Sequence, residues 1–525
     1  MLLGLVLLLS VPMISIGLDL FGGGAWPKTL SLYIWNTLGL MIGVGLLATF
    51  IGVSCAWFIS AYDFPGRKIL SWALILPIAA PAYIIAYVYA DLLEYFGPVQ
   101  STLRGLFGWE QGDYVFPSIR NPMGAIFTLS FVLYPYVYLL ARASFLNQSR
   151  SQWQAARNLG LTARQAFFRI ALPSARPAIA GGAALVLMET LADFGVADFF
   201  AVPTFSVGIF RNWLILGDRP AAMKLAAVML LAVILLVILE SSTRRGSTAS
   251  LGKTRAQSDR ISLKGWRAAL ITGLCVLPVL LGLIIPITRL IYHSVSGGDN
   301  MAASQLFGFT INSLILGVVV GLMALTLALY LSFSKRANPS KTRSTFIRIG
   351  TLGYALPGAL LAVGLLTPLA LFDQSLTRFA KSALGWGGGL ILTGTIIALA
   401  YALVIRFLTV AFNSVDANLE QISPSLENVS RSLGAGYWRR TRQILLPLLR
   451  PGLISAFILV FIDVMRELPA TLIMRPFNFD TLATRIYWLA SDERLAEAST
   501  AALIIIGVSI IPTLYLNAFM SKKEG

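Results

Sequence analysis

Long apolar stretches separated by polar loops dominate this sequence and restrict what it can fold into. Twelve of them reach the roughly 20 residues that a helix needs to cross the hydrocarbon core of a bilayer. They lie near residues 1–21, 34–60, 69–93, 122–142, 178–197, 222–242, 268–289, 311–333, 347–372, 388–411, 452–474 and 501–520. Charged residues make up 12% of the chain, whereas soluble domains carry roughly 25%. The sequence predicts an all-α polytopic membrane protein with about twelve transmembrane helices and excludes an ordinary soluble enzyme.

The distribution of basic residues predicts the orientation. With both termini in the cytoplasm, about two thirds of the Lys and Arg residues fall in inner loops, as the positive-inside rule requires. The net charge of +17 is then explained by topology and anionic lipid headgroups, without a nucleic-acid partner. The first stretch begins at Met1 without a basic leader, so we expect a retained helix; a cleaved signal peptide is the alternative.

Cysteine and histidine are too few for several kinds of site. The chain holds two cysteines, Cys55 and Cys275, each inside an apolar run, and one histidine, His293. Sites built on several His or Cys ligands are therefore excluded. We expect His293 to lie in an outer loop, exposed to solvent. A membrane-embedded enzyme would need a catalytic constellation that the sequence does not offer, so we predict that the chain is not an enzyme.

The chain is a tandem repeat. Residues 154–160, followed by Leu172-Pro173, match residues 428–434, followed by Leu446-Pro447, at a constant offset of 274. Asn36-Thr37 matches Asn312-Ser313, and Pro81 matches Pro357, at an offset of 276. We predict two parallel six-helix halves, 1–242 and 268–525, joined by a basic cytoplasmic linker at 243–267. A GKT triplet in that linker resembles a phosphate-binding loop, but it lacks the preceding strand and one glycine.

The repeated loops, 150–177 and 424–451, each predict a short helix, a turn centred on Gly160 or Gly434, and a second helix. Glycine can adopt the positive φ that such a turn needs. We expect Pro173 and Pro447 to end the second helix and direct the chain into the next span. The segments are amphipathic, so they can lie on the membrane or dock into a groove on a partner.

Four acidic residues occupy matching places in the fifth span of each half. Glu189 and Asp193 are spaced i, i+4, and Asp463 and Glu467 repeat them at the same offset of 274. A charge at this depth costs at least ~2.5 kcal/mol, so such residues mark functional sites by default. One interpretation is a carboxylate-lined path for a cation, which could hold a hard metal ion transiently. The other is structural: the acids pair with Arg466 or cap broken helices near Gly195 and Pro469.

These features resemble a known family. The pattern EAA, three residues, Gly, then Leu-Pro is the signature loop of bacterial ABC importer permeases. Here its first copy has Gln154, Ala155, Ala156 and Gly160, and its second has Asn428, Val429, Ser430 and Gly434, so both depart from the Glu. Segments 134–142, 189–195 and 467–476 look like the fused two-repeat permease of ferric-iron (iron(III)) ABC importers.

The resemblance implies that this chain forms the membrane path and that separate proteins hydrolyse ATP and deliver the substrate. The coupling loops, including Leu172, Pro173, Leu446 and Pro447, would dock on a separate homodimeric ABC ATPase that binds ATP and Mg, while this chain binds no cofactor. A periplasmic binding protein would deliver the substrate to the outer loops near 94–121, 198–220, 290–310 and 474–500. The chain would sit in the bacterial inner membrane. Thiamine or another cationic small molecule is the alternative substrate, and a secondary transporter is the alternative class.

Overall fold

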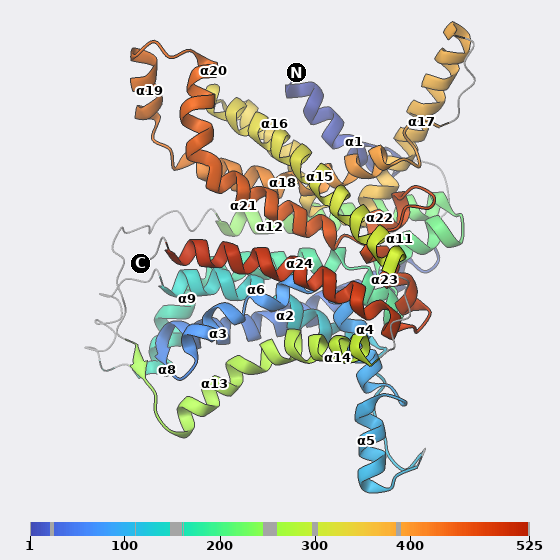
Figure 1. Cartoon of the computed structure of the whole chain (residues 1–525), viewed down its shortest axis with the longest axis vertical. Coiled ribbons are helices and arrows are strands. Elements are labelled where there is room, and N and C mark those ends of the chain that lie inside the picture. Colours follow the sequence, from blue (N-terminus) through green and yellow to red (C-terminus); the bar gives the residue numbers. More distant parts are fainter. Residues whose placement is uncertain are drawn as a thin grey trace. The chain divides into compact units, whose positions relative to one another are not determined.

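The structure is a computed structural model that describes residues 2–20, 26–110, 112–146, 160, 162–244, 260–296, 303–384 and 390–522. Helices form almost all of the described chain (Figure 1). The only strands in these ranges are β1 (Tyr62–Asp63) and β2 (Ile261–Ser262), which pair in parallel. The all-α class predicted from the apolar stretches is confirmed.

The long helices account for the predicted spans. Ten are long and apolar enough to cross a membrane, and a bent pair of shorter helices adds an eleventh candidate. A twelfth region, in α24 (Leu495–Lys522), has a shorter apolar part, Leu495–Ile511. The ten begin with α1 (Leu2–Leu20), α2 (Leu30–Ala61), α6 (Pro122–Leu146), α9 (Leu172–Ala192) and α12 (Arg219–Arg244), and continue with α13 (Trp266–Val279) together with α14 (Ile285–Val295), α15 (Ala303–Ala337), α17 (Gly358–Leu384), α18 (Ile396–Glu420) and α21 (Leu446–Met465).

The repeated prolines Pro81 and Pro357 mark the same break in both halves. Each follows a short 3-10 turn, η1 (Leu76–Ala79) or η5 (Leu352–Ala355), and each directly precedes a new helix, α4 (Ala82–Leu93) or α17. The residue before a proline avoids the helical region, so the helix must restart there. The predicted span 347–372 therefore begins later, at Gly358, and extends to Leu384.

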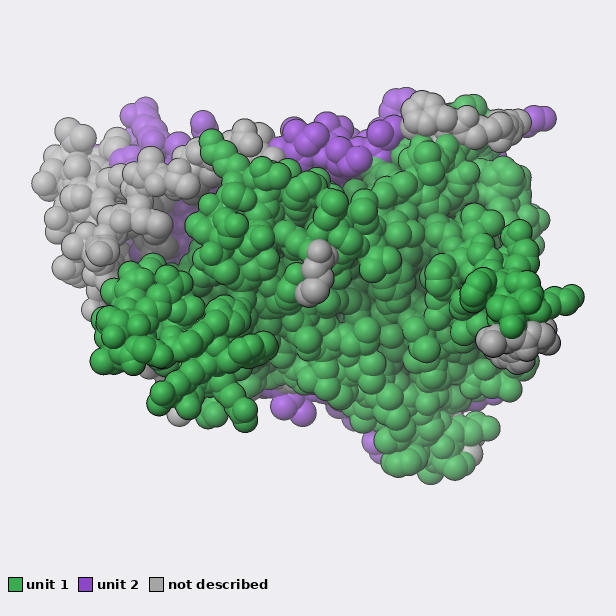
Figure 2. Space-filling view, turned by 90° about the horizontal axis from the view of Figure 1, so that it is seen from above, with its two compact units in different colours: residues 1–27, 208–230, 301–488 green, residues 28–207, 231–300, 489–525 purple. Residues whose placement is uncertain are grey.

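The chain packs into two compact units that differ from the two sequence halves (Figure 2). Unit 1 comprises residues 1–27, 208–230 and 301–488, and unit 2 comprises 28–207, 231–300 and 489–525. In unit 1, α15, α18 and α21 pack on one another, and α1 lies against α17 and α16 (Lys341–Gly350). In unit 2, α2, α6 and α9 form the corresponding core, joined by α13, α14 and α24. Each unit thus includes the first helix of the other sequence half.

Small residues let the helices of unit 2 approach closely. A Cβ on Gly52 of α2 would lie 2.8 Å from the Val137 Cβ of α6, and one on Gly182 of α9 would lie 2.7 Å from the Val137 Cα. Helix pairs in membranes use such small residues because lipid gives no hydrophobic drive for their association. On α2 the Cys55 thiol also hydrogen-bonds with that of Cys275 on α13, and both are buried.

Candidate functional site: the repeated loops and the broken helices

The two repeated glycines have the backbone conformation that the sequence predicts. Gly160 has φ +72° and Gly434 has φ +76°, and nothing lies within 4 Å of where a Cβ would stand on either. Residues other than glycine rarely adopt a positive φ. The backbone conformation of the turn therefore requires glycine, and a lack of space for a Cβ does not.

The second repeated loop is described in full. Its first helix, α19 (Pro424–Ser432), begins after Ser423, whose hydroxyl accepts a hydrogen bond from the Ser425 N–H. Asn428 and Val429 are exposed, whereas Ser430 is buried. In the first loop, Gln154, Ala155 and Ala156 lie outside the described residues.

An apolar row on α19 faces solvent. Leu426, Val429 and Leu433 are spaced i, i+3 and i+7 and are all exposed, and Trp438 beyond the turn is 80% exposed. This spacing places them on one side of the helix. Of these residues only Val429 belongs to the docking set predicted from the sequence. The i, i+3, i+7 spacing in the sequence could also have indicated Leu426 and Leu433.

An arginine that sequence reasoning missed holds this loop in place. Arg336, at the end of α15, forms an ion pair with Glu427 of α19 at 2.5 Å (Nε to Oε1). Its other nitrogens donate to the carbonyls of Leu419 and Ile422, the latter at 2.8 Å. Because one planar guanidinium binds the end of α18 and the start of α19, the apolar row is presented on a fixed support.

The prediction that Pro173 and Pro447 end the second helix of each loop is wrong. Neither proline ends a helix. Each lies in the first turn of a long helix, α9 or α21, directly after a π-helical turn, η2 (Phe167–Ala171) or η6 (Thr441–Leu445). A proline fits the first helical turn because its missing N–H needs no partner there, and the wider π turn accommodates its ring. The loop therefore continues directly into the span, with Leu172 and Leu446 half-buried.

In the first half, the acidic pair flanks a helix break. α9 ends at Ala192, and Asp193 has extended backbone. Its Oδ1 accepts the Ala197 N–H at 3.1 Å and so caps α10 (Gly195–Phe199). Glu189 lies half-buried in the last turn of α9. The predicted i, i+4 face is therefore wrong, because the helix ends before Asp193.

The second half has the same break with two arginines added. Glu467, which is buried, accepts the Ala470 N–H at 3.1 Å near the start of α22 (Pro469–Met474). It also accepts from Arg406 Nη1 at 3.2 Å. Asp463 pairs with Arg466. The structural interpretation, pairing with Arg466 and capping of a broken helix, is confirmed for these contacts.

A glycine makes room for the buried ion pair. A Cβ on Gly358 would lie 2.4 Å from both Arg406 Nη1 and Glu467 Oε1. The residue at the matching position of the first half is Ala82, and the position matching Arg406 is Val132. The sequence alone gave no reason to connect Gly358 with the charges, since 109 positions separate it from Glu467.

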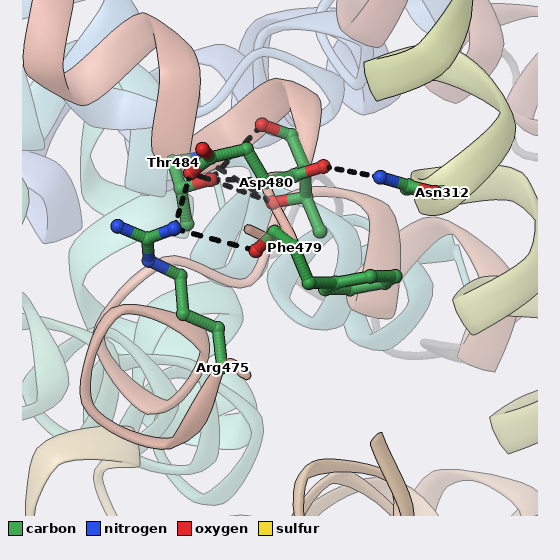
Figure 3. Close-up of polar contacts among 6 residues, drawn as sticks. Asn312, Arg475, Phe479, Asp480 and Thr484 are labelled. Atoms are coloured by element: carbon green, nitrogen blue, oxygen red, sulfur yellow. Dashed lines mark hydrogen bonds and ion pairs between the residues drawn. The ribbon is translucent and has the colours of Figure 1, made fainter. Parts of the chain in front are cut away.

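The repeated Asn-Thr and Asn-Ser pairs bind matching loops in the two units. In unit 1, Asn312 Nδ2 donates to the Asp480 carbonyl at 3.0 Å (Figure 3). Ser313 Oγ accepts the Leu482 N–H at 2.8 Å. Arg475 closes the loop through an ion pair with Asp480 at 2.7 Å. In unit 2, Asn36 donates to the Pro203 carbonyl, and Thr37 accepts the Phe205 N–H. The sequence match thus reflects the same pair of side-chain-to-backbone hydrogen bonds in both units.

His293 departs from its predicted place. It lies on α14 with a side chain only 14% exposed, and its Nε2 is 3.1 Å from Asp91 Oδ2. Arg289, one turn earlier, binds the same oxygen at 2.5 Å. The helix continues beyond the predicted end of the span at 289, which brings the imidazole against α4 instead of into solvent.

The described acidic residues and His293 do not gather into a metal-binding cluster. Within the part of the chain that the structure describes, no three His, Cys, Asp or Glu side chains form a group that could hold a metal ion. Glu189 and Asp193 belong to unit 2, and Asp463 and Glu467 to unit 1.

Comparison with known proteins identifies the family. The chain is 27% identical over 493 residues, 93% of its length and 90% of the relative's, to the Fe(3+)-transport system permease protein FbpB 2 of Haemophilus influenzae. Over 41% of this chain and 74% of the relative it is 28% identical to the putative 2-aminoethylphosphonate transport system permease protein PhnV of Salmonella paratyphi A. The sulfate transport system permease protein CysT of Salmonella typhimurium is 28% identical over 35% of this chain and 69% of its own. Residues 48–245 and 332–523 both match the model of the binding-protein-dependent transport system inner membrane component, so the chain belongs to that family and is the two-repeat permease component of an ABC importer.

Proposed function

We propose that this permease imports iron(III). The observation that carries the proposal is the alignment with a ferric-iron permease over almost the full length of both chains, whereas the phosphonate and sulfate relatives align with less than half of this one. The four buried or half-buried carboxylates at the helix breaks agree with a cationic substrate, because hard oxygen ligands suit hard ions. Iron here is the cargo, and it would meet Glu189, Asp193, Asp463 and Glu467 transiently.

The repeated loops would transmit the work of ATP hydrolysis. A homodimeric ATPase, which binds the ATP and Mg, would dock on Gly160 and its preceding segment in one half and on α19 in the other. The exposed row of Leu426, Val429 and Leu433 supports this, since an apolar helix face fits a groove on a partner. Both termini would then be cytoplasmic, and a periplasmic binding protein would meet the opposite face.

Uptake of radiolabelled iron(III) tests the substrate. Cells that lack their other iron importers would carry this gene with its ATPase, with an inactivated ATPase, or neither. We expect uptake only with the gene and the active ATPase. No uptake by correctly assembled protein would reject iron(III) and favour thiamine or another cationic small molecule.

Cross-linking tests the docking surface independently of the substrate. Cys55 and Cys275 are buried, so a cysteine at Val429 would be the accessible thiol. We expect Val429→Cys to cross-link to a cysteine in the ATPase cleft, and Ser432→Cys, a polar neighbour outside the apolar row, to do so less. Equal cross-linking of both would argue against docking through this row.

A further inference from the structure

The segment between α4 and α6 is a folded hairpin. Its helix, α5 (Pro98–Phe107), is fixed by a side-chain network. Arg104 Nη1 donates to the Tyr95 carbonyl at 2.8 Å and to the Tyr114 hydroxyl at 2.9 Å, and Tyr114 donates to Gln100 Oε1 at 2.8 Å. Gln100 in turn donates to the Leu93 carbonyl at the end of α4, at 2.7 Å. The hairpin is thus firmly attached to a membrane helix of unit 2.

One side of α5 is apolar, and three of its four residues are exposed, with Leu103 half-buried. Val99, Leu103, Leu106 and Phe107 are spaced i, i+4, i+7 and i+8, which places them in one stripe. Leu106 is 73% and Phe107 60% exposed, and the Phe107 ring stacks on Trp109 with centroids 4.6 Å apart. The stripe contains no charged residue. The only charged residue on the helix, Arg104, lies outside the stripe and donates to the Tyr95 carbonyl and the Tyr114 hydroxyl.

The direction of α5 distinguishes it from the spans of its own unit. Figure 1 shows α2, α6, α9 and α24 running in about the same direction, while α5 runs crosswise to them and projects beyond them. It lies at the end of the unit 2 spans away from α8 (Ala163–Ala166). If the long helices cross the bilayer, α5 extends along the membrane surface, beside the lipid that surrounds the protein.

We propose that α5 is an interfacial helix whose apolar stripe inserts into the lipid at this membrane surface. A short amphipathic helix lying in the membrane plane with exposed Leu and Phe has the composition of such anchors. Trp109, at its end, belongs to the residue types enriched at the headgroup level.

Anchoring α5 in lipid would hold the outer part of the broken-helix site. Arg120, at the end of the hairpin, binds Glu94 and places its guanidinium 4.9 Å from the centre of the Phe199 ring. Phe199 ends α10, the helix that Asp193 caps, and it also contacts Tyr87 of α4. The hairpin therefore connects the membrane surface to the break in the first half.

Lipid-borne quenchers test the proposal. Leu106→Cys and Ser101→Cys would be labelled in the full chain with an environment-sensitive fluorophore and reconstituted in phosphatidylethanolamine–phosphatidylglycerol vesicles. The two positions share one short helix but face opposite sides, and the unsubstituted chain gives the background from the buried native cysteines. We expect a nitroxide near the lipid headgroup to quench the Leu106→Cys label at least about threefold more than the Ser101→Cys label, and aqueous iodide to show the reverse preference.

Two outcomes would overturn the proposal. In one, iodide quenches both labels equally and the lipid nitroxide quenches neither, which means that the stripe faces water. In the other, the Leu106→Cys label becomes protected only when a substrate-binding protein is added, which assigns the stripe to that protein. Neither outcome depends on the transported substrate.

Discussion

The two broken-helix sites share a capping hydrogen bond but differ in the residues around their carboxylates. In both, a carboxylate after the break accepts an N–H from the next short helix: Asp193 from Ala197 and Glu467 from Ala470. In the second half, Arg406 also binds Glu467, and Arg466 binds Asp463. The matching positions of the first half are Val132 and Ala192.

The difference shows that duplicated acids need not have duplicated roles. The second pair is balanced by two guanidinium groups, while no arginine stands at the matching positions of the first. We therefore expect the second site to depend on its ion pairs for stability.

The largest expected effect is on the stability of the second site. Arg406→Leu would leave Glu467 buried without its partner and should cost about 3–5 kcal/mol of unfolding free energy. The control is Val132→Leu at the matching place, which should cost less than about 1.5 kcal/mol. Denaturant unfolding in detergent measures both. A double variant, Arg406→Leu with Glu467→Gln, should recover part of the loss because the amide still caps Ala470. Unchanged stability of Arg406→Leu would remove the electrostatic distinction between the halves.

Gly358→Ala tests the space around the ion pair. The new Cβ would lie 2.4 Å from the atoms of both partners, so we expect a loss of about 1–3 kcal/mol. Ala82→Gly makes the reciprocal change in the first half and should cost no more than about 1 kcal/mol. Melting temperatures of the two purified variants compare them directly. An equal fall in melting temperature in both variants would mean that Gly358 is not needed to make room for the Arg406–Glu467 ion pair.

The carboxylates are compared through uptake. Glu189→Gln and Asp193→Asn should each reduce iron(III) uptake roughly tenfold, equivalent to about 1.4 kcal/mol, with assembly and stability retained. Asp463→Asn and Glu467→Gln should also reduce uptake, but together with stability, because they leave arginines unbalanced. Uptake and melting temperature would be measured on the same four variants. Normal transport by all four would make the acids purely structural.

The repeated turns provide the closest match between the two halves, since Gly160 and Gly434 have nearly the same φ. Gly160→Val and Gly434→Val should each cost about 1–2 kcal/mol locally, because β-branched residues resist positive φ. We expect ATP hydrolysis to continue while uptake falls. Gly436→Val is the control, since Gly436 has φ −64° and open space around its Cβ. Normal coupling in both turn variants would argue against a role for the turns in transmission.

Local patterns predicted much of this molecule. Runs of apolar residues indicated the ten helices of the described chain that are long and apolar enough to cross a membrane, because burial of the backbone in lipid requires long helices. The matched spacing around Gly160 and Gly434 indicated a turn with positive φ, which the structure confirms. The pairs Asn36-Thr37 and Asn312-Ser313 indicated equivalence of the halves before their loop contacts were known.

Other features were decided by contacts between distant residues. The sequence placed Asp193 on the same helix face as Glu189, but the helix ends between them and the carboxylate turns to the next N–H groups. It placed His293 in solvent, although packing of α14 on α4 brings the imidazole to Asp91. It gave no hint that Arg336 supports α19.

The sequence by itself determined the class of the protein, its repeat and its turns, because apolar length, periodicity and glycine act within a few residues. Only the tertiary structure decided which charges meet. The ion pair between Arg406 and Glu467 forms only because packing brings their helices together, and Gly358 leaves the space for it. No local sequence pattern indicates that these residues lie close together. The same holds for the compact units, in which α1 and α13 pack with helices of the opposite sequence half.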